Sequence, residues 1–182
     1  MKAVIIILSV IQLFHIVVSC PRNGVCFRTH LQICCYDVPL KEVPDGEVNA
    51  TQYLELRFAS IFILTNDTLQ NKGLLDLVSL IIEFSHLSII HSGAFHNTPH
   101  LRTIDLSGND LEVIPQSLFQ GLFFLTYLHL SKNKLNILPP RIFEGLSLIT
   151  HLDLSYNYFE SFSSNVFYGM SLANTSDTVQ IA

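Results

Sequence analysis

The sequence lacks the features that mark several large functional classes. Its 10 lysine and arginine residues are outnumbered by 15 aspartate and glutamate residues and form no cluster, which gives a net charge of -5. A chain without a basic patch attracts phosphate backbones poorly, so we expect no nucleic acid partner. The sequence also contains no nucleophile elbow, metal-binding helix or phosphate-binding loop. We therefore expect no enzymatic activity, no cofactor and no bound metal.

Long apolar runs are absent beyond the N-terminus. Residues 1–19 resemble a secretory signal peptide cleaved after Ser19, because Lys2 is followed by an apolar stretch from Ala3 to Val18. One alternative is an uncleaved signal anchor, for which this stretch is short against the roughly 20 residues that cross a bilayer. A bacterial lipoprotein cleavage box ending at Cys20 is another. Because no later uncharged apolar run reaches the length of about 18 residues that a span needs, we expect a secreted, extracellular chain with no membrane span after signal removal.

Cysteine is confined to one short segment near the N-terminus, at Cys20, Cys26, Cys34 and Cys35. In an exported chain such an even-numbered cluster indicates a disulfide knot. A zinc site is the competing interpretation, but the C-x-x-C spacing that zinc modules favour is missing. A bond between the adjacent Cys34 and Cys35 would be strained. We therefore expect one of these two to join Cys20 and the other to join Cys26, and the sequence leaves open which joins which.

The most informative pattern is an internal repeat. Residues 101–111 follow the pattern L-x-x-L-x-L-x-x-N-x-L, and the pattern recurs before and after this segment. The copies, numbered here as coils 1 to 5, open at Thr51, Leu77, Leu101, Leu125 and Ile149, which is a 24-residue period from the second copy onwards. The first copy is irregular and opens two positions earlier than this period predicts. The phenylalanines keep the same period at Phe95, Phe119, Phe143 and Phe167.

These copies resemble the 24-residue class of extracellular leucine-rich repeats, in which the pattern continues x-x-L-P-x-x-x-F-x-G-L. The segments VIPQSLFQGL and ILPPRIFEGL carry that second half, and the similarity covers residues 51–172. The resemblance implies an α/β solenoid. In this leucine-rich repeat arc, short parallel strands line the concave face, and irregular or short helical segments form the convex side.

The repeated polar and aromatic positions have structural roles in such an arc. Asn109, Asn133 and Asn157 should form a buried ladder, because their amides can pair with backbone groups that neighbouring coils leave unpaired. Ser85 can supply part of this ladder, whereas Ala59 cannot. The four repeated phenylalanines should stack as a spine on the convex side.

The N-terminal segment CPRNGVCFRTHLQICCYDVPLKEVPDG resembles the cysteine-rich cap of extracellular members of this family. It departs from the family pattern, which commonly has two cysteines one residue apart in the middle of the cap. The expected organisation is a signal peptide at 1–19, a cysteine-rich cap at 20–50, five repeats at 51–172 and a polar C-terminal tail or incomplete repeat at 173–182.

The C-terminal end of the repeats carries a further expectation. Continuing the period puts a sixth copy at Ala173, with Ser176 and Thr178 in place of the strand leucines and no cysteine-bonded cap after them. The interpretations are an end-to-end homodimer through the uncapped end, a truncated or alternatively spliced product, and a tail that serves as a cap. We favour the tail cap with some dimerisation, because a glycan at Asn174 would oppose close stacking.

Ligand contacts should lie on concave positions that the repeat leaves free, because the core positions are structural. Exposed aromatic residues among carboxylates and imidazoles suit a protein partner. A solvated face with no partner is the alternative. The predicted ligand-binding residues are Tyr53, Glu55, Phe84, Asp105, Tyr127, His129, His151, Asp153 and Tyr156. Phe58 and Lys132 occupy two of the other free positions.

Two further patterns concern metals and glycans. His129 lies between Asp105 and Asp153 on adjacent strands, which also fits a metal site or a catalytic base. An open sheet offers no pocket, so hydrogen-bonded surface residues are the preferred interpretation. Three N-x-S/T triplets predict glycosylation at Asn49, Asn66 and Asn174.

The expected function is that of a secreted binding module that recognises an extracellular protein or glycan ligand on its concave face. The resemblance implies a role in innate immune recognition, cell adhesion or a receptor ectodomain. The alternative is a structural protein of the extracellular matrix, similar to the small leucine-rich proteoglycans. Their cap spacing fits poorly, however, and no Ser-Gly attachment cluster precedes the repeats.

Overall fold

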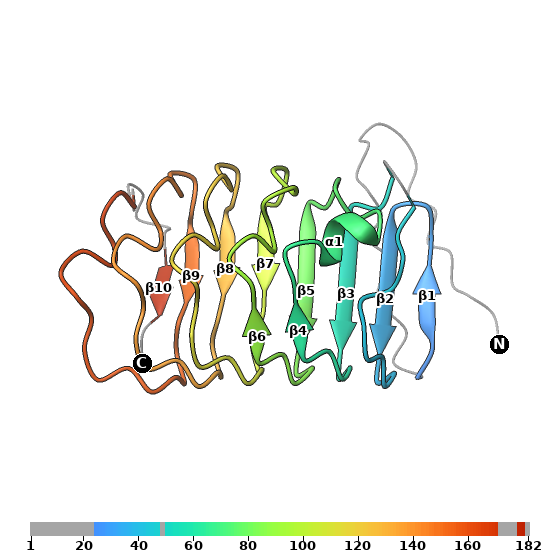
Figure 1. Ribbon diagram of the computed structural model, residues 1–182, viewed down its shortest axis with the longest axis horizontal. Coiled ribbons are helices and arrows are strands. Elements are labelled where there is room, and N and C mark those ends of the chain that lie inside the picture. The colour runs from blue at the N-terminus through green and yellow to red at the C-terminus, as the bar shows by residue number, and fades with distance from the viewer. Residues whose placement is uncertain (1–23, 48–49, 171–177, 181–182) are drawn as a thin grey trace, which may run out of the picture.

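The protein is a curved β-solenoid, seen here in a computed structural model that describes residues 24–47, 50–170 and 178–180 (Figure 1). Eight strands form one sheet in the order β1-β2-β3-β5-β7-β8-β9-β10, and a second sheet pairs β4 with β6. The larger sheet consists of β1 (Cys26–Arg28), β2 (Gln32–Tyr36), β3 (Tyr53–Arg57), β5 (Ser79–Glu83), β7 (Thr103–Asp105), β8 (Tyr127–His129), β9 (His151–Asp153) and β10 (Thr178–Gln180). The other elements are β4 (Ile63–Leu64), β6 (Ile89–Ile90) and the four-residue helix α1 (Thr68–Asn71).

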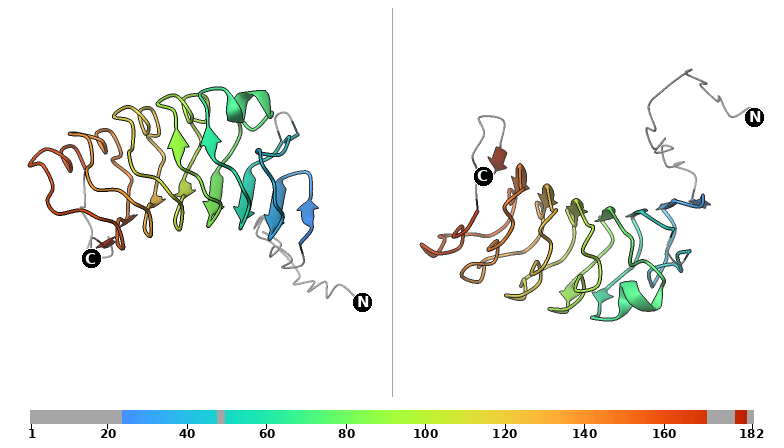
Figure 2. Two further views of the ribbon diagram at one scale, coloured as in Figure 1. Left: turned by 60° about the horizontal axis from the view of Figure 1, so that its bottom comes forward. Right: turned by 90° about the horizontal axis from the view of Figure 1, so that it is seen from above.

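The repeat period sets the strand register. Each strand from β3 to β9 pairs in parallel with the next one in the large sheet, and the coil-to-coil partners include Leu80 with Ile104 and Leu128 with Leu152. These side chains point inward and are fully buried, whereas the residues on either side face outward. The large sheet lines the inner, concave side of the arc, and β4, β6 and α1 lie on the outer side (Figure 2). The predicted fold is confirmed.

The convex side is filled by the phenylalanine spine. The rings of successive coils stack with centroid separations of 6.5, 6.3 and 5.8 Å and nearly parallel planes. The stack consists of Phe95, Phe119, Phe143 and Phe167. Burial of three of these rings and the offset ring contacts stabilise the outer wall, as the sequence pattern predicts.

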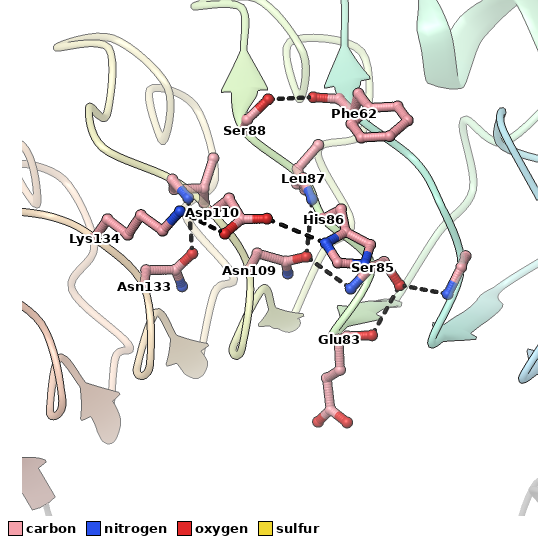
Figure 3. Close-up of polar contacts among 12 residues, drawn as sticks. Phe62, Glu83, Ser85, His86, Leu87, Ser88, Asn109, Asp110, Asn133 and Lys134 are labelled. Carbon is pink, nitrogen blue, oxygen red and sulfur yellow. Dashed lines mark hydrogen bonds and ion pairs between the residues drawn. The ribbon is translucent and has the colours of Figure 1, made fainter.

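The asparagine ladder joins each coil to the one before it (Figure 3). The Asn109 amide donates to the carbonyl oxygens of Ile82 and Leu106 at 2.6 and 2.9 Å. Its oxygen accepts from the backbone N–H groups of Ser85 and Leu87 at 3.0 and 3.1 Å. Asn133 repeats this arrangement one coil later, with 5% of its surface exposed. The side chain therefore satisfies backbone groups where the chain leaves the strand, and the predicted ladder is confirmed.

The ladder weakens towards the N-terminus, as expected from the residues that replace asparagine. The hydroxyl of Ser85 accepts one bond from the Ala59 N–H at 3.1 Å and donates one to the carbonyl of Glu83 at 2.8 Å. The Ser85 side chain therefore makes two hydrogen bonds at the ladder position, whereas the Asn109 side chain makes five. Ala59 has no side-chain polar group to contribute.

The N-terminal end is covered by a disulfide-bonded hairpin. Strands β1 and β2 are antiparallel, and β2 extends the large sheet by pairing in parallel with β3. Cys26 and Cys35 lie opposite each other in the hairpin and form a disulfide. Cys34 is also disulfide-bonded, whereas Cys20 lies outside the described residues. The sequence leaves open which of Cys34 and Cys35 joins Cys26, and the structure shows that it is Cys35.

The sheet continues at the C-terminal end with a register that differs from the predicted one. Thr178 pairs with His151 and Val179 with Leu152, so the last step along the chain is three positions longer than the 24-residue period. The expectation of Ser176 and Thr178 in the leucine slots is therefore wrong. The longer step brings an apolar residue, Val179, opposite Leu152 and against the core, which a strict 24-residue step would not do. The Leu154 N–H donates to the Gln180 carbonyl at 2.8 Å.

We predict that Asn133→Ala lowers the free energy of unfolding by about 2 to 4 kcal/mol, because buried backbone groups of two coils lose their partners. Asn136→Ala is the matched control, since Asn136 is exposed in the same coil. It should change stability by less than about 0.5 kcal/mol. Urea unfolding followed by circular dichroism measures both. Equal effects of the two substitutions would show that the ladder does not stabilise the stack.

Candidate ligand-binding site

The strand register brings the predicted concave residues together in two neighbouring columns. Each column has one member on each of β3, β5, β7, β8 and β9, and adjacent members are paired residues. The first column contains Tyr53, Ser79, Thr103, Tyr127 and His151. The second contains Glu55, Ile81, Asp105, His129 and Asp153. These side chains share the outward face of the sheet because strand residues alternate between the two faces.

The N-terminal half of this face is held by an ion-pair network. Arg57 donates from Nε to the Glu55 carboxylate at 2.5 Å and also contacts the carboxylate of Glu83. Glu83 is buried, so the positive charge of Arg57 compensates a carboxylate that is shielded from water. Glu55, a predicted ligand contact, is therefore fixed in place by Arg57, which is not among the predicted contacts.

The C-terminal half carries the imidazoles and an exposed tyrosine. The Tyr127 ring stacks on the His151 ring with centroids 4.4 Å apart, and 41% of Tyr127 is exposed. His151 Nδ1 lies 2.8 Å from the hydroxyl of Thr150. A hollow of about 130 Å³ lies between β8, β9 and β10 and is lined by His129, His151, Leu152, Asp153 and Gln180. This hollow is small and suits a single side chain of a ligand.

His129 contacts only one of its two acidic neighbours. Its Nδ1 lies 3.5 Å from Oδ2 of Asp105. The carboxylate of Asp153 instead accepts hydrogen bonds from the backbone N–H and the hydroxyl of Ser155 at 2.9 and 2.6 Å. The two carboxylates and the imidazole therefore do not converge on one point. Among the described residues, no group of three or more His, Cys, Asp and Glu side chains is placed to hold a metal ion.

The His129–Asp105 contact shifts both groups in opposite directions. Hydrogen bonding to Asp105 raises the pKa of His129 above its ordinary value, against the opposing effect of burial. Burial is the largest single influence on Asp105 and works upward. Together, however, the hydrogen bonds from His129 and Ser107 outweigh it and lower the pKa of Asp105. The pair is thus charged over a wider pH range than two isolated groups would be.

A row of exposed side chains runs along the edge where the strands end. Phe58 and Phe84 stack with centroids 5.4 Å apart, and Tyr36 of the cap meets Phe58 edge to face at 5.3 Å. Further along, the Lys132 ammonium lies 5.8 Å from the Phe84 centroid and 5.9 Å from that of Tyr156. Phe84 and Tyr156 are predicted contacts that the structure places in one row. We call Tyr36, Phe58, Phe84, Lys132 and Tyr156 the aromatic edge.

Four of the five residues of the aromatic edge, all except Tyr36, occupy one repeat position, immediately before the ladder residue of their coil. The backbone there has positive φ angles in all five coils, including 55° at Phe58, 48° at Phe84 and 55° at Tyr156. Bulky side chains are uncommon in this conformation. Two members of the row, Phe84 and Tyr156, are among the ligand contacts predicted from the sequence. Their shared position in the 24-residue repeat is the sequence signal that identifies them as one row. This signal does not extend to Tyr36, which lies in the cap.

One predicted glycosylation site lies in the described part of the chain. Asn66 is exposed on the convex side, and its side-chain oxygen accepts a hydrogen bond from the Gly93 N–H at 2.9 Å. A glycan would attach to the amide nitrogen, which this bond does not use. Asn49 and Asn174 lie outside the described residues.

This geometry defines a solenoid repeat protein whose stacked coils present a parallel sheet on a concave face. A family model described as leucine rich repeat matches residues 75–135 and 123–173, which together make up more than half of the chain. The chain belongs to the leucine-rich repeat family. Within the described ranges, no helix is long and apolar enough to cross a bilayer.

A comparison with solved structures supports the same assignment. The chain is similar to the protein in a crystal structure of a TLR13–ssRNA13 complex, with a TM-score of 0.62 and 29% sequence identity. The match covers 70% of this chain and 19% of that chain, so this chain spans about a fifth of the other protein's length. No curated protein matches the sequence.

We predict that Asp105→Asn lowers the pKa of His129 towards 6.5, because the hydrogen-bonded carboxylate raises it. A histidine with a raised folded-state pKa contributes stability below its unfolded-state pKa and loses it as the pH rises through the folded-state value. Wild-type protein should therefore lose stability as the pH rises from about 6.5 upwards, and the variant should lose less.

The measurements are the imidazole proton shifts of His129 in NMR spectra and urea unfolding across that pH range. Asp153→Asn is the matched control, since Asp153 affects His129 only through a weaker, longer-range charge interaction. A His129 pKa that stays unchanged in Asp105→Asn would show that the 3.5 Å contact does not determine it.

Proposed function

We propose that this chain is a secreted, non-enzymatic binding module that recognises an extracellular protein on its concave face and aromatic edge. The observation that carries this proposal is the aromatic edge together with the exposed Tyr127–His151 stack. Exposed aromatic side chains supply a large share of the energy at protein interfaces, and here they lie beside a pre-arranged set of charges.

The side chains of this surface are already held in place before a ligand arrives. Arg57 fixes Glu55, the His151 ring supports Tyr127, and Lys132 lies between two aromatic rings. Fewer rotamers are then lost on binding, which lowers the entropic cost of association. This pre-organisation favours the interpretation of a ligand-binding face over that of a solvated face.

The chemistry of the face favours protein over nucleic acid. The similar solved protein was crystallised with RNA. In this chain, Glu55, Glu83, Asp105 and Asp153 all lie on the sheet, and Arg57 is already shared between two of them. A phosphate backbone would meet net negative charge there, which opposes the counterion release that drives nucleic acid binding. We therefore propose a protein ligand and treat RNA as an outcome to be tested.

Secretion is part of the proposal. Its support is the N-terminal segment with the character of a signal peptide and the Cys26–Cys35 disulfide, which is typical of oxidising compartments.

We predict that replacing Tyr127 and His129 together with alanine weakens ligand binding by at least about 30-fold, or about 2 kcal/mol. The ligand is first captured from extracellular fluid with the wild-type chain and identified by mass spectrometry. Its affinity for each variant is then measured by biolayer interferometry, with a single-stranded RNA oligonucleotide as a second probe. Tyr158→Ala is the matched control, because Tyr158 is exposed but lies off the concave strands.

The outcomes separate the competing functions. Loss of binding in the double variant with an unchanged circular dichroism spectrum, and full binding by Tyr158→Ala, supports the concave site. Unchanged binding by the double variant would move the site elsewhere. Tight binding of the RNA probe would contradict a protein ligand, and bulk binding to matrix fibres would favour the structural matrix function.

We further predict that the chain expressed in animal cells appears in the medium with Cys20 as its first residue. The signal peptidase would cleave after Ser19, and the exported chain would then be oxidised and glycosylated. Intact mass spectrometry before and after glycosidase treatment measures the N-terminus and the glycan mass. Retention in the membrane fraction with Lys2 still present would contradict secretion.

A further inference from the structure

A second exposed surface lies on the convex side, away from the proposed ligand site. Four β-branched residues occupy one repeat position in coils 1 to 4 and are 41, 52, 62 and 63% exposed. In chain order they are Ile63, Ile89, Val113 and Ile137. Ile63 and Ile89 are paired residues on β4 and β6, and the 24-residue period places the other two in line with them. We call these four residues the apolar stripe.

The stripe is a feature of the surface, since each of its residues is followed by a buried one. The neighbouring residues Leu64, Ile90, Ile114 and Leu138 fill the core. In coil 5 the stripe position is Ser161, so the stripe ends there. Four adjacent positions at strand spacing extend over about 15 Å. An ordered line of exposed aliphatic side chains of this kind is typical of a contact surface.

Charged residues beside the stripe are partly paired with one another, and Figure 3 shows the contacts of Asp110 with His86 and Lys134. Asp110 lies 3.3 Å from His86 of the preceding coil and 2.8 Å from Lys134 of the following coil. Glu112 lies in the row next to the stripe, where coils 1, 2 and 4 have Phe62, Ser88 and Asn136. The flank is therefore mixed in charge, in contrast to the acidic concave face.

We propose that the apolar stripe is a self-association surface that binds a second copy of this chain in antiparallel register about a two-fold axis. The axis passes between coils 2 and 3 and places Ile63 opposite Ile137 and Ile89 opposite Val113 of the second copy. A two-fold interface uses the same patch on both subunits, so each opposing pair occurs twice.

Charge complementarity favours a second copy as the occupant. In this register the charged flanking residues meet neutral or opposite partners: Asp110 faces His86, Glu112 faces Ser88, and Lys134 faces Ser60. No like charges lie opposite each other. A register shifted by one coil towards the C-terminus would bring Asp110 opposite Asp110 and Glu112 opposite Glu112, which is repulsive. A shift of one coil towards the N-terminus would leave Ile137 without a stripe residue opposite it. In the proposed register, all four stripe residues are covered, and the charged residues beside the stripe face neutral or oppositely charged residues of the second copy.

The interface is small, so the expected dimer is weak. A stripe of about 15 Å with its flanking rows lies at the low end of specific interfaces, for which dissociation constants in the micromolar range are usual. The contact is distinct from end-to-end association at the C-terminus, because it uses the side of the coils.

The test uses the full chain secreted from animal cells and analysed by sedimentation velocity from about 1 to 200 μM, a range chosen around that affinity. Wild-type protein should shift from monomer to dimer. Ile89→Lys and Val113→Asp should each remain monomeric throughout, with unchanged circular dichroism spectra. Ser161→Asp is the matched control and should dimerise like wild type, because it adds a charge at the same repeat position beyond the stripe.

Mixing the variants tests the register. Ile89→Lys mixed with Val113→Asp should regain a dimer, because the axis places these two positions opposite each other. Ile89→Lys mixed with Ile89→Asp should not, because two copies of position 89 do not face each other. A dimer in the second mixture and none in the first would overturn the antiparallel register.

Three further results would overturn the proposal as a whole. The first is a wild-type chain that is monomeric over the full range. The second is a dimer that persists in both single stripe variants, which would locate the contact elsewhere, including the C-terminal end. The third is a dimer that forms only after glycosidase treatment, since Asn66 lies near the stripe.

Discussion

The structure depends on one interaction, the bridge that an asparagine side chain makes between successive coils. Asn109 alone closes contacts with the backbone of residues 82, 85 and 87 in the preceding coil. A coil has no core of its own, so its leucines are buried only if the next coil is held in register. The amide fixes that register at the point where the chain leaves the strand. The alignment of the concave columns and of the convex stripe follows from it.

The residue before each ladder position has the same backbone conformation in every coil. In all five coils this residue has a positive φ angle, including 68° at Gly108. Glycine suits this conformation best, whereas an aromatic residue there is strained at a cost on the order of 1 kcal/mol. Coils 1, 2 and 5 nevertheless carry Phe58, Phe84 and Tyr156. Aromatic residues at a position that favours glycine indicate a use other than stability, in agreement with their place in the proposed binding face.

Gly108 has a second role within this row. A Cβ atom at this position would lie 2.3 Å from the Phe84 ring, so the absence of a side chain allows Phe84 to lie across coil 3. The ring then comes within 5.8 Å of the Lys132 ammonium, two coils away. The edge is therefore continuous although its middle coil contributes no aromatic residue. A single glycine connects the two halves of the surface.

The sequence predicts the parts of this molecule that depend on the period. The inward leucines, the ladder and the phenylalanine spine recur with the 24-residue period, so several matching copies support each assignment even where one copy departs from the pattern, as coil 1 does at Ala59. The last strand could not be placed this way, because the burial of Val179 outweighs the period and lengthens the final step by three positions. The preference of His129 for Asp105 over Asp153 was also not predictable. Both carboxylates are one strand away, and each accepts hydrogen bonds from the serine two residues further on, Ser107 or Ser155, so the residue pattern does not distinguish them.

The two surfaces have opposite positions on the arc, and this has a consequence for binding. The large sheet lies on the concave side, and β4 and β6, which carry the stripe residues Ile63 and Ile89, lie on the convex side (Figure 2). A dimer formed through the stripe would leave both concave faces and both aromatic edges uncovered and directed away from each other. Such a dimer could not bind one small ligand between its copies, but it could hold two ligands or two sites of a repetitive ligand at once. Binding a repetitive ligand at two sites raises the effective concentration for the second contact, so a weak dimer and a moderate single-site affinity together can produce tight binding.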